Sequence, residues 1–344
     1  MVVKLSEIVA HGGDLGAARH QFPAAPEPWI DLSTGINPEA YAVPQLAADV
    51  WTRLPQPDEQ LALLQAAARR YGALSPDMLV AAPGSQALIQ VVPRLVGPSS
   101  VAILGPTYGE HGAVWRRAGH EVVDVGTLAE IGSARIVVIV NPDNPTGRIV
   151  AADELCALAA ALDARGGMLV VDEAFADVMA DGVSLAPQLP PATILLRSFG
   201  KFYGLAGLRL GFAIAHAETA MRLSRELGPW AVSGPALAIG IKALGDDRWL
   251  AQARQKLSGA CRRLDELLAA CGLVVEGGTP LFRLVRHPMA QEIANALGRE
   301  GIHVRRFADQ RQWLRLGLPG PEYAWQRLAQ ALAAPSLSTE GQGI

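Results

Sequence analysis

Blocks of apolar residues alternate with helical patterns from about residue 79 to residue 215. Helical patterns rich in Ala and Leu lie at residues 85–95, 109–118 and 151–164. Between and around them are short aliphatic runs with the length of buried strands, at residues 79–82, 101–104, 121–125, 135–140, 168–171, 193–197 and 210–215. Apolar strands that alternate with helices predict an α/β fold, in which a mostly parallel central sheet is sandwiched by helices.

The pattern changes at about residue 218. Long helical patterns at 235–244 and 249–271 are followed by strands at 273–275 and 281–285 and by helices at 290–299 and 322–333. This order predicts a smaller α+β C-terminal domain. The beginning of the chain is rich in Pro and Gly and predicts an arm. We therefore expect an N-terminal arm (1–40), a large domain (41–217), a small domain (218–334) and a polar tail (335–344).

Composition narrows the class of protein. Hydrophobic residues make up 50% and charged residues 18% of the 344, which indicates a folded protein with a sizeable core. The 30 Lys and Arg nearly balance the 33 Asp and Glu, which argues against broad binding to nucleic acid. Cys156, Cys261 and Cys271 form no CxxC motif, so neither a disulfide framework nor a metal site is expected. The chain shows no signal-peptide pattern and no apolar run of ~20 residues, so we expect a cytoplasmic protein with no membrane partner.

Two polar motifs follow predicted strands, at the place where open α/β sheets bind ligands. Pro83-Gly84-Ser85-Gln86 opens a helix, and such a turn either binds a phosphate through backbone N–H groups or is an ordinary N-cap made by Ser85. The segment 141–147 reads Asn-Pro-Asp-Asn-Pro-Thr-Gly. It indicates either a ligand-binding loop or a structural tight turn.

Two further motifs carry charge. Asp172-Glu173 ends a buried strand, where a carboxylate needs a cationic partner. That partner is a metal ion, a basic side chain or a protonated ring nitrogen, and the motif alone does not choose. Ser198-Phe199-Gly200-Lys201 follows the next strand, with Arg209 eight residues after the lysine. A lysine in a cleft is a candidate for a Schiff base, and a surface position is the alternative.

The four motifs in this order resemble those of the fold-type-I pyridoxal-phosphate enzymes, over residues of about 30 to 330. Within that superfamily the sequence is most similar to the histidinol-phosphate aminotransferase branch. His11-Gly12-Gly13, the segment 31–38 and the Gly-Pro-Trp-Ala-Val at 228–232 resemble the threonine-phosphate decarboxylases of cobalamin biosynthesis. A turn cap at His11 and core packing of Trp230 are the alternative interpretations.

The resemblance implies a role for each motif. Lys201 would bind the cofactor, pyridoxal 5'-phosphate, covalently, and Asp172 would keep its pyridine nitrogen protonated. Tyr108 would stack on the ring and is the third implied catalytic residue. Asn144 would hydrogen-bond the phenolic oxygen. The implied cofactor-binding residues are Gly84, Ser85, Gln86, Tyr108, Asn144, Asp172, Ser198, Lys201 and Arg209.

The resemblance also implies how the substrate binds. Arg315 would clamp the substrate carboxylate, because a planar guanidinium suits a bidentate contact. Arg305 would meet the substrate phosphate together with residues of the N-terminal arm. The implied substrate-binding residues are His11, Gly12, Asn37, Asn144, Arg305 and Arg315. A two-fold symmetric homodimer is expected, since it is the commonest closed arrangement.

Two positions depart from the pattern of the relatives. Many of them have a tyrosine where this chain has Phe175, so a hydroxyl on the cofactor oxygen is missing and Asn144 carries more of that role. The aminotransferases of the branch have Arg-Tyr-Pro-Asp-Pro, whose tyrosine reaches the partner subunit's cofactor phosphate. Here the segment 53–57 is Arg-Leu-Pro-Gln-Pro, and Leu54 has no hydroxyl. This difference weakens the assignment as an aminotransferase.

Three functions remain open at the level of the sequence. The leading hypothesis is decarboxylation of L-threonine O-3-phosphate to (R)-1-amino-2-propanol O-2-phosphate. The alternative is a histidinol-phosphate or related class I/II aminotransferase. A regulatory module that binds the cofactor without catalysis is the third, and the absence of a helix-turn-helix pattern in the first ~40 residues argues against it.

Overall fold

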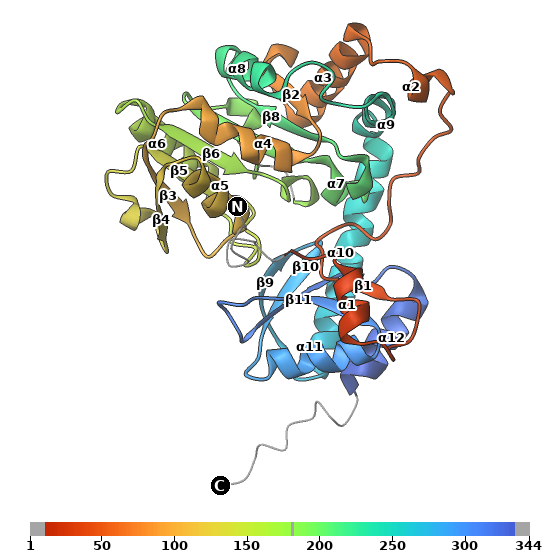
Figure 1. Ribbon diagram of the computed structural model, residues 1–344. Coiled ribbons are helices and arrows are strands. Elements are labelled where there is room, and N and C mark those ends of the chain that lie inside the picture. The colour runs from red at the N-terminus through yellow and green to blue at the C-terminus, as the bar shows by residue number, and fades with distance from the viewer. Residues whose placement is uncertain (1–10, 180–181, 334–344) are drawn as a thin grey trace, which may run out of the picture. The chain divides into compact units, whose positions relative to one another are not determined.

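The computed structural model describes residues 11–179 and 182–333. Contacts divide the chain into two compact units (Figure 1). Unit 1 is Ala40–Gln252, and unit 2 combines the described parts of Ala10–Glu39 and Ala253–Ile344. Among the described residues, no helix is both long enough and apolar enough to cross a membrane.

Unit 1 contains a seven-stranded sheet in the order β2-β8-β7-β6-β5-β3-β4. Its strands are β2 (Leu79–Ala82), β3 (Ser100–Leu104), β4 (Glu121–Val125), β5 (Ile136–Val140), β6 (Met168–Asp172), β7 (Thr193–Ser198) and β8 (Gly211–Ile214). β8 is antiparallel to β2 and β7, and the other pairs are parallel. The predicted mostly parallel α/β sheet is therefore confirmed. Every residue of β5 is buried, as its unbroken apolar sequence predicts for a central strand.

Helices cover both faces of this sheet. They are α2 (Asp49–Thr52), α3 (Pro57–Tyr71), α4 (Ser85–Val91), α5 (Glu110–Arg117), α6 (Ala152–Asp163), α7 (Phe199–Phe202), α8 (Ala217–Leu227) and α9 (Gly234–Leu244). On one face Leu88, Trp115 and Leu223 pack with alternate residues of the strands. On the other face Tyr71 packs edge-on against Phe212, with ring centroids 5.7 Å apart. The helix predicted at 85–95 is α-helical only to Val91, because Pro93 has no N–H to donate and Val92–Leu95 forms a 3-10 turn.

Unit 2 contains a five-stranded sheet in the order β1-β11-β12-β10-β9. Its elements are β1 (Ile30–Leu32), β9 (Val274–Thr279), β10 (Phe282–Arg286), β11 (Ile302–Arg306), β12 (Trp313–Gly317), α1 (Leu15–Gln21), α11 (Ala290–Arg299) and α12 (Glu322–Ala333). β1 is parallel to β11, whereas the other pairs are antiparallel. The long helix α10 (Asp247–Ala270) contains the boundary between the units.

This division differs from the expected domain boundaries at 40/41 and 217/218. Most of the expected arm belongs to unit 2, because Ile30 and Leu32 are buried and β1 pairs with β11. Residues 218–252 belong to unit 1, because α9 packs against α3 and α8 packs against β2. The first ten residues of the arm and the predicted tail 335–344 lie outside the described residues.

Candidate active site

The predicted motifs of unit 1 lie at one edge of its sheet. β2, β3, β5, β6 and β7 all point the same way, because β2 and β7 are both antiparallel to β8. Asp172 is the last residue of β6, and the segments that follow the other four strands carry Gly84, Tyr108, Asn144 and Lys201. Site residues from five strand ends thus lie at one edge, which is the usual ligand-binding edge of such a sheet.

The turn at Gly84 and the side chain of Arg209 form a cradle that fits an anion. Gly84 has φ +86°, and a Cβ there would lie 2.6 Å from Arg209 Nη2. Gly84, and not Ser85, is the N-cap of α4, so the alternative interpretation of Ser85 as a capping side chain is wrong. The Arg209 guanidinium thus occupies the space that a side chain at position 84 would fill, and it lies beside the N–H groups at the start of α4. Both groups favour a phosphate.

Asp172 is buried at the end of β6 and pairs with a histidine. Its Oδ2 lies 2.9 Å from His111 Nε2, and its Oδ1 accepts a hydrogen bond of 3.0 Å from the N–H of Ala174. The side chains of His111 and Asp172 are only 2% and 4% exposed. The sequence reasoning missed His111. Its only signal was its position on α5, three residues after Tyr108.

Glu173 has a different partner from its neighbour Asp172. Arg197 Nη1 donates to Glu173 Oε2 at 2.8 Å, and the same guanidinium also binds Asp177. All three side chains are buried, and burial alone would lower the pKa of Arg197. The two carboxylates prevail and raise it, so Arg197 stays charged. Of the partners left open by the sequence, Glu173 therefore has the basic side chain. No cluster that could hold a metal ion is found among the described residues.

Tyr108 and Gln86 belong to one polar network. The Tyr108 hydroxyl donates to Gln86 Oε1 at 3.2 Å, and Gln86 Nε2 donates to Glu110 Oε2 at 2.8 Å. The Tyr108 ring lies edge-on to His111, with centroids 6.1 Å apart. The structure thus connects two of the predicted site residues to the histidine that holds Asp172.

Lys201 lies on α7, the short helix that follows β7. Its Nζ is 5.7 Å from the centroid of the Phe175 ring. Phe175 is 2% exposed and follows β6 by three residues. Ser198 is the last residue of β7 and is paired with Gly211 of β8. The strand ends that carry Asp172 and Ser198 are neighbours in the sheet.

Unit 2 holds a second group of predicted residues. Arg305 of β11 and Arg315 of β12 are directly opposite each other in the antiparallel register. Arg315 is buried, donates to the Ser33 carbonyl at 2.6 Å and lies over the Phe282 ring at 5.0 Å. Two guanidinium groups on neighbouring strands concentrate positive charge, which suits a substrate with more than one anionic group.

The segment 11–37 lies beside this pair. A Cβ on Gly12 would be 2.3 Å from the Ser33 carbonyl oxygen, so any residue other than glycine would clash here. The N–H of Gly13 donates to Ser33 Oγ at 2.7 Å. Asn37 is buried and accepts from the N–H of Glu39 at 2.9 Å, whereas His11 is exposed. Ser33, which contacts both Gly13 and Arg315, was not singled out from the sequence.

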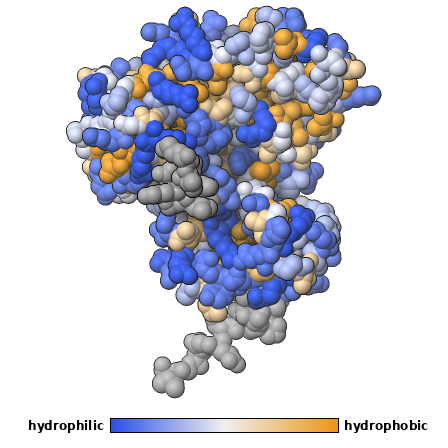
Figure 2. Space-filling model, in the orientation of Figure 1, coloured by the Kyte–Doolittle hydropathy of each residue, from blue (hydrophilic) through white to orange (hydrophobic). Residues whose placement is uncertain are grey.

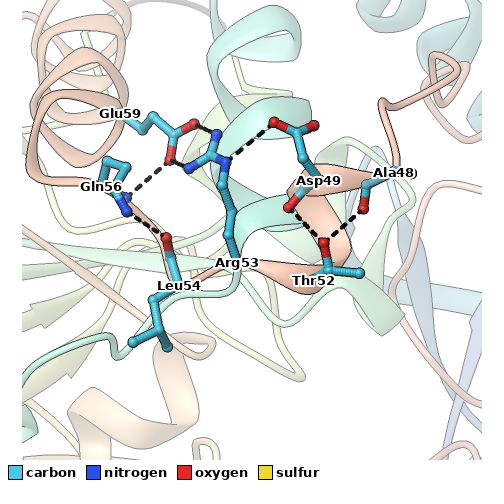
Figure 3. Close-up of polar contacts among 7 residues, drawn as sticks. All are labelled: Ala48, Asp49, Thr52, Arg53, Leu54, Gln56 and Glu59. Atoms are coloured by element: carbon cyan, nitrogen blue, oxygen red, sulfur yellow. Dashed lines mark hydrogen bonds and ion pairs between the residues drawn. The ribbon is translucent and has the colours of Figure 1, made fainter.

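The segment around Leu54 is braced from within. Arg53 Nη1 donates to Glu59 Oε2 at 3.0 Å, the second guanidinium nitrogen binds Glu59 Oε1, and Arg53 Nε reaches Asp49 at 3.3 Å (Figure 3). Gln56 Nε2 donates to the Leu54 carbonyl at 2.8 Å. The Leu54 side chain is 58% exposed and points away from these polar contacts.

Comparison with known proteins defines the class of this one. Residues 27–332 match the family model of aminotransferase class I and II. Because the match covers most of the chain, the protein belongs to that family.

The relatives narrow the class further. A threonine-phosphate decarboxylase from Pseudomonas aeruginosa is 42% identical over 329 residues, covering 94% of this chain and 97% of that protein. A threonine-phosphate decarboxylase from Sinorhizobium sp. is also 42% identical, over 97% of this chain and all of that protein. Among solved structures, a histidinol-phosphate aminotransferase from Sinorhizobium meliloti in complex with pyridoxal-5'-phosphate has a TM-score of 0.78. It is 26% identical and covers 92% of this chain and 93% of that one.

Proposed function

We propose that this protein is a pyridoxal-phosphate-dependent decarboxylase of L-threonine O-3-phosphate. The products are CO2 and (R)-1-amino-2-propanol O-2-phosphate, a precursor in cobalamin biosynthesis. One observation carries the proposal: two threonine-phosphate decarboxylases are 42% identical over nearly the whole chain. The alternative, a histidinol-phosphate aminotransferase, is supported by a structure of similar fold at 26% identity.

The residues at the edge of the unit 1 sheet fit the cofactor. The cradle at Gly84 and Arg209 fits its phosphate, and Ser85 and Ser198 would add hydroxyl groups. When bound, the cofactor draws electrons from a bond at the substrate Cα, provided that its ring nitrogen is protonated. Asp172 would hold that proton at the nitrogen, and the hydrogen bond to His111 fixes the orientation of the carboxylate.

The other unit 1 residues would orient the ring. Tyr108 would stack on it, with its hydroxyl held by Gln86. Asn144 would donate to the phenolic oxygen, where Phe175 supplies no hydroxyl. Lys201 would bind the cofactor covalently at rest and, once released, move the proton that replaces the carboxylate at Cα.

The residues of unit 2 would bind the substrate. Arg315 would clamp the carboxylate, and Arg305, with His11, Gly12 and Asn37, would grip the phosphate. Binding energy from the substrate phosphate would hold the substrate in the pose in which the bond from Cα to the carboxylate is the one that breaks. CO2 would leave, and the proton moved by Lys201 would take its place at Cα.

A direct assay separates the two candidate functions. Purified protein is incubated with cofactor and threonine phosphate, and CO2 and the amino-alcohol phosphate are measured. We expect stoichiometric release of both, and unphosphorylated threonine should be a poor substrate. Consumption of histidinol phosphate and 2-oxoglutarate at an ordinary enzymic rate, with no CO2 from threonine phosphate, would establish the aminotransferase instead.

We also propose that the protein is a homodimer. Trp51, Leu54 and Leu61 are 68%, 58% and 47% exposed on α2, α3 and the segment between them. Figure 2 shows apolar residues gathered over the side of unit 1 that carries α2, α3 and α9. A grouped apolar surface of this kind is typical of a protein interface. Light scattering should give twice the chain mass of 36.3 kDa, and a stable, active monomer at micromolar concentration would refute the proposal.

A further inference from the structure

Two loops of the proposed cofactor site are tied together by an arginine. The β3 loop (residues 105–109) carries Tyr108, and the β5 loop (residues 141–150) carries Asn144. Arg148 of the β5 loop donates from Nη1 to the Gly105 carbonyl and from Nη2 to the Leu104 carbonyl, both at 3.0 Å. The Arg148 carbonyl accepts from the N–H of Asp143 at 2.8 Å. Arg148 therefore links the backbone of its own loop to the end of β3.

The carboxylate of Asp143 lies inside this arrangement. It is fully buried, and its Oδ2 accepts from the N–H of Thr146 at 3.1 Å and from Thr146 Oγ1 at 2.5 Å. Its Oδ1 is buried without a hydrogen bond of good geometry, and so is Thr107 Oγ1 in the β3 loop. The loops that carry Thr107 and Asp143 follow β3 and β5, which are neighbouring parallel strands. Burial raises the pKa of Asp143, and the hydroxyls of Thr107 and Thr146 oppose that rise.

A buried acceptor and a buried donor without partners each destabilise the folded state, and a hydrogen bond between them removes that penalty. Thr107 directly precedes Tyr108, and Asp143 directly precedes Asn144. A hydrogen bond from Thr107 Oγ1 to Asp143 Oδ1 would therefore fix the spacing between the proposed ring-stacking residue and the proposed donor to the phenolic oxygen.

We infer that Thr107, Asp143 and Arg148 form a bracket between the β3 and β5 loops, and that they are positioning residues for Tyr108 and Asn144. The bracket touches neither cofactor nor substrate, and it acts by holding two side chains that do. The inference rests on the proposed function, because it assigns the bracket to the cofactor named there.

The sharpest test compares two substitutions of Thr107. Thr107→Val keeps the shape but removes the hydroxyl, whereas Thr107→Ser keeps the hydroxyl. The readouts are cofactor affinity, from quenching of protein fluorescence, and the pH midpoint of the visible absorbance of the bound cofactor. A misplaced Asn144 stabilises the deprotonated phenolic oxygen less well. Thr107→Val should therefore weaken cofactor binding about 5-fold and raise the midpoint by ~0.5–1 pH unit, while Thr107→Ser stays close to wild type.

Arg165 supplies a matched control for Arg148. The Arg165 guanidinium also donates to loop carbonyls beside the same sheet, those of Ala134 at 2.7 Å and Gly132 at 3.4 Å. These carbonyls precede β5, at the end of the strand opposite to the proposed cofactor site. Arg148→Ala should weaken cofactor binding and shift the midpoint in the same direction as Thr107→Val. Arg165→Ala should change thermal stability alone.

The outcomes are distinct. If wild type fails to bind the cofactor, the proposed function fails first. If wild type binds it but Thr107→Val leaves both affinity and midpoint unchanged, or if Thr107→Ser matches Thr107→Val, the bracket is wrong and the proposed function stands. Equal effects of Arg148→Ala and Arg165→Ala on the midpoint would also overturn the bracket.

Discussion

The two sheets hold their candidate site residues in different ways. In unit 1 the residues lie at the ends of strands or on the loops and helix starts that follow, where neighbours can hold them, as His111 and Ala174 hold Asp172. In unit 2 Arg305 and Arg315 lie within strands and are opposite each other in the register of β11 and β12, and Arg315 also donates to the Ser33 carbonyl. Loops with their own polar braces can hold a rigid group in one orientation, whereas paired strands place charge close together. We expect substitutions in unit 1 to change the binding and the absorbance of the cofactor, and substitutions in unit 2 to change the binding of the substrate.

The largest effect should come from Lys201→Ala. Without the covalent attachment the protein should lose the absorbance band of the lysine-linked cofactor and all measurable CO2 release, while some cofactor remains bound through its phosphate. Absorbance spectra and a CO2 assay check this. Lys256→Ala, on an exposed lysine of unit 2 paired with Glu39, is the control and should keep both. A Lys201→Ala variant that keeps both this band and its CO2 release would remove this lysine from the mechanism.

Arg305→Ala should have the next largest effect, and it should weaken use of the substrate without changing the cofactor. Loss of a charge-assisted contact to the substrate phosphate should cost roughly 2–4 kcal/mol of transition-state stabilisation, measured as a lower kcat/KM for threonine phosphate. The absorbance spectrum of the bound cofactor should not change. The neighbouring Arg306 binds Asn295 at 2.9 Å, so Arg306→Ala is a matched control that should stay near wild type. A changed cofactor spectrum in Arg305→Ala would contradict the separation between the units.

His111→Phe should affect unit 1 more moderately. It leaves Oδ2 of the buried Asp172 without its partner, which costs about 1–3 kcal/mol in transition-state stabilisation if the carboxylate turns away from the ring nitrogen. We expect a lower kcat and a shifted pH midpoint of the cofactor absorbance. His111→Asn, which retains a donor, should recover part of both. If only KM for threonine phosphate changed, His111 would belong with the substrate contacts.

The smallest effect concerns the pH dependence of unit 2. Burial lowers the pKa of His303, although Asp31 opposes this, so the folded state favours the neutral ring. That contribution is present above about pH 6.5, the ordinary pKa of histidine, and is lost as the pH falls toward the lowered value. Wild type should therefore lose more thermal stability between pH 7.5 and 5.5 than His303→Gln does. Equal losses in melting experiments would show that His303 does not contribute.

The sequence predicts the sheet of unit 1 better than the sheet of unit 2, although the helices predicted at 290–299 and 322–333 match α11 and α12 of unit 2 to the residue. The strand predicted at 79–82 matches β2 to the residue, because it is a continuous apolar run, and the strand predicted at 121–125 matches β4, which reads Glu-Val-Val-Asp-Val. Gly84 and Lys201 lie in motifs a few residues long, so their surroundings are local. β1 has three residues and pairs with a strand far along the chain, so no local pattern reveals it.

The partners of the site residues were harder to predict than the residues themselves. His111 looks like any buried histidine on a helix until the fold brings Asp172 to it from 61 residues away. Ser33 likewise gains its meaning from Arg315, at a separation of 282 residues. Such contacts depend on strand order and register, which the hydrophobic pattern does not specify.

The pairing of β1 with β11 has a consequence for the order in which the protein is made. Ile30 leaves the ribosome early, but its partner Ile302 follows 272 residues later. At a synthesis rate of ~5–20 residues per second, β1 waits for tens of seconds as an unpaired strand. The segment Ala40–Gln252 of unit 1 can be completed in that interval. The last sheet to form is thus the sheet of unit 2, to which we assign substrate binding. A chain interrupted before residue 302 would leave β1 without its partner strand.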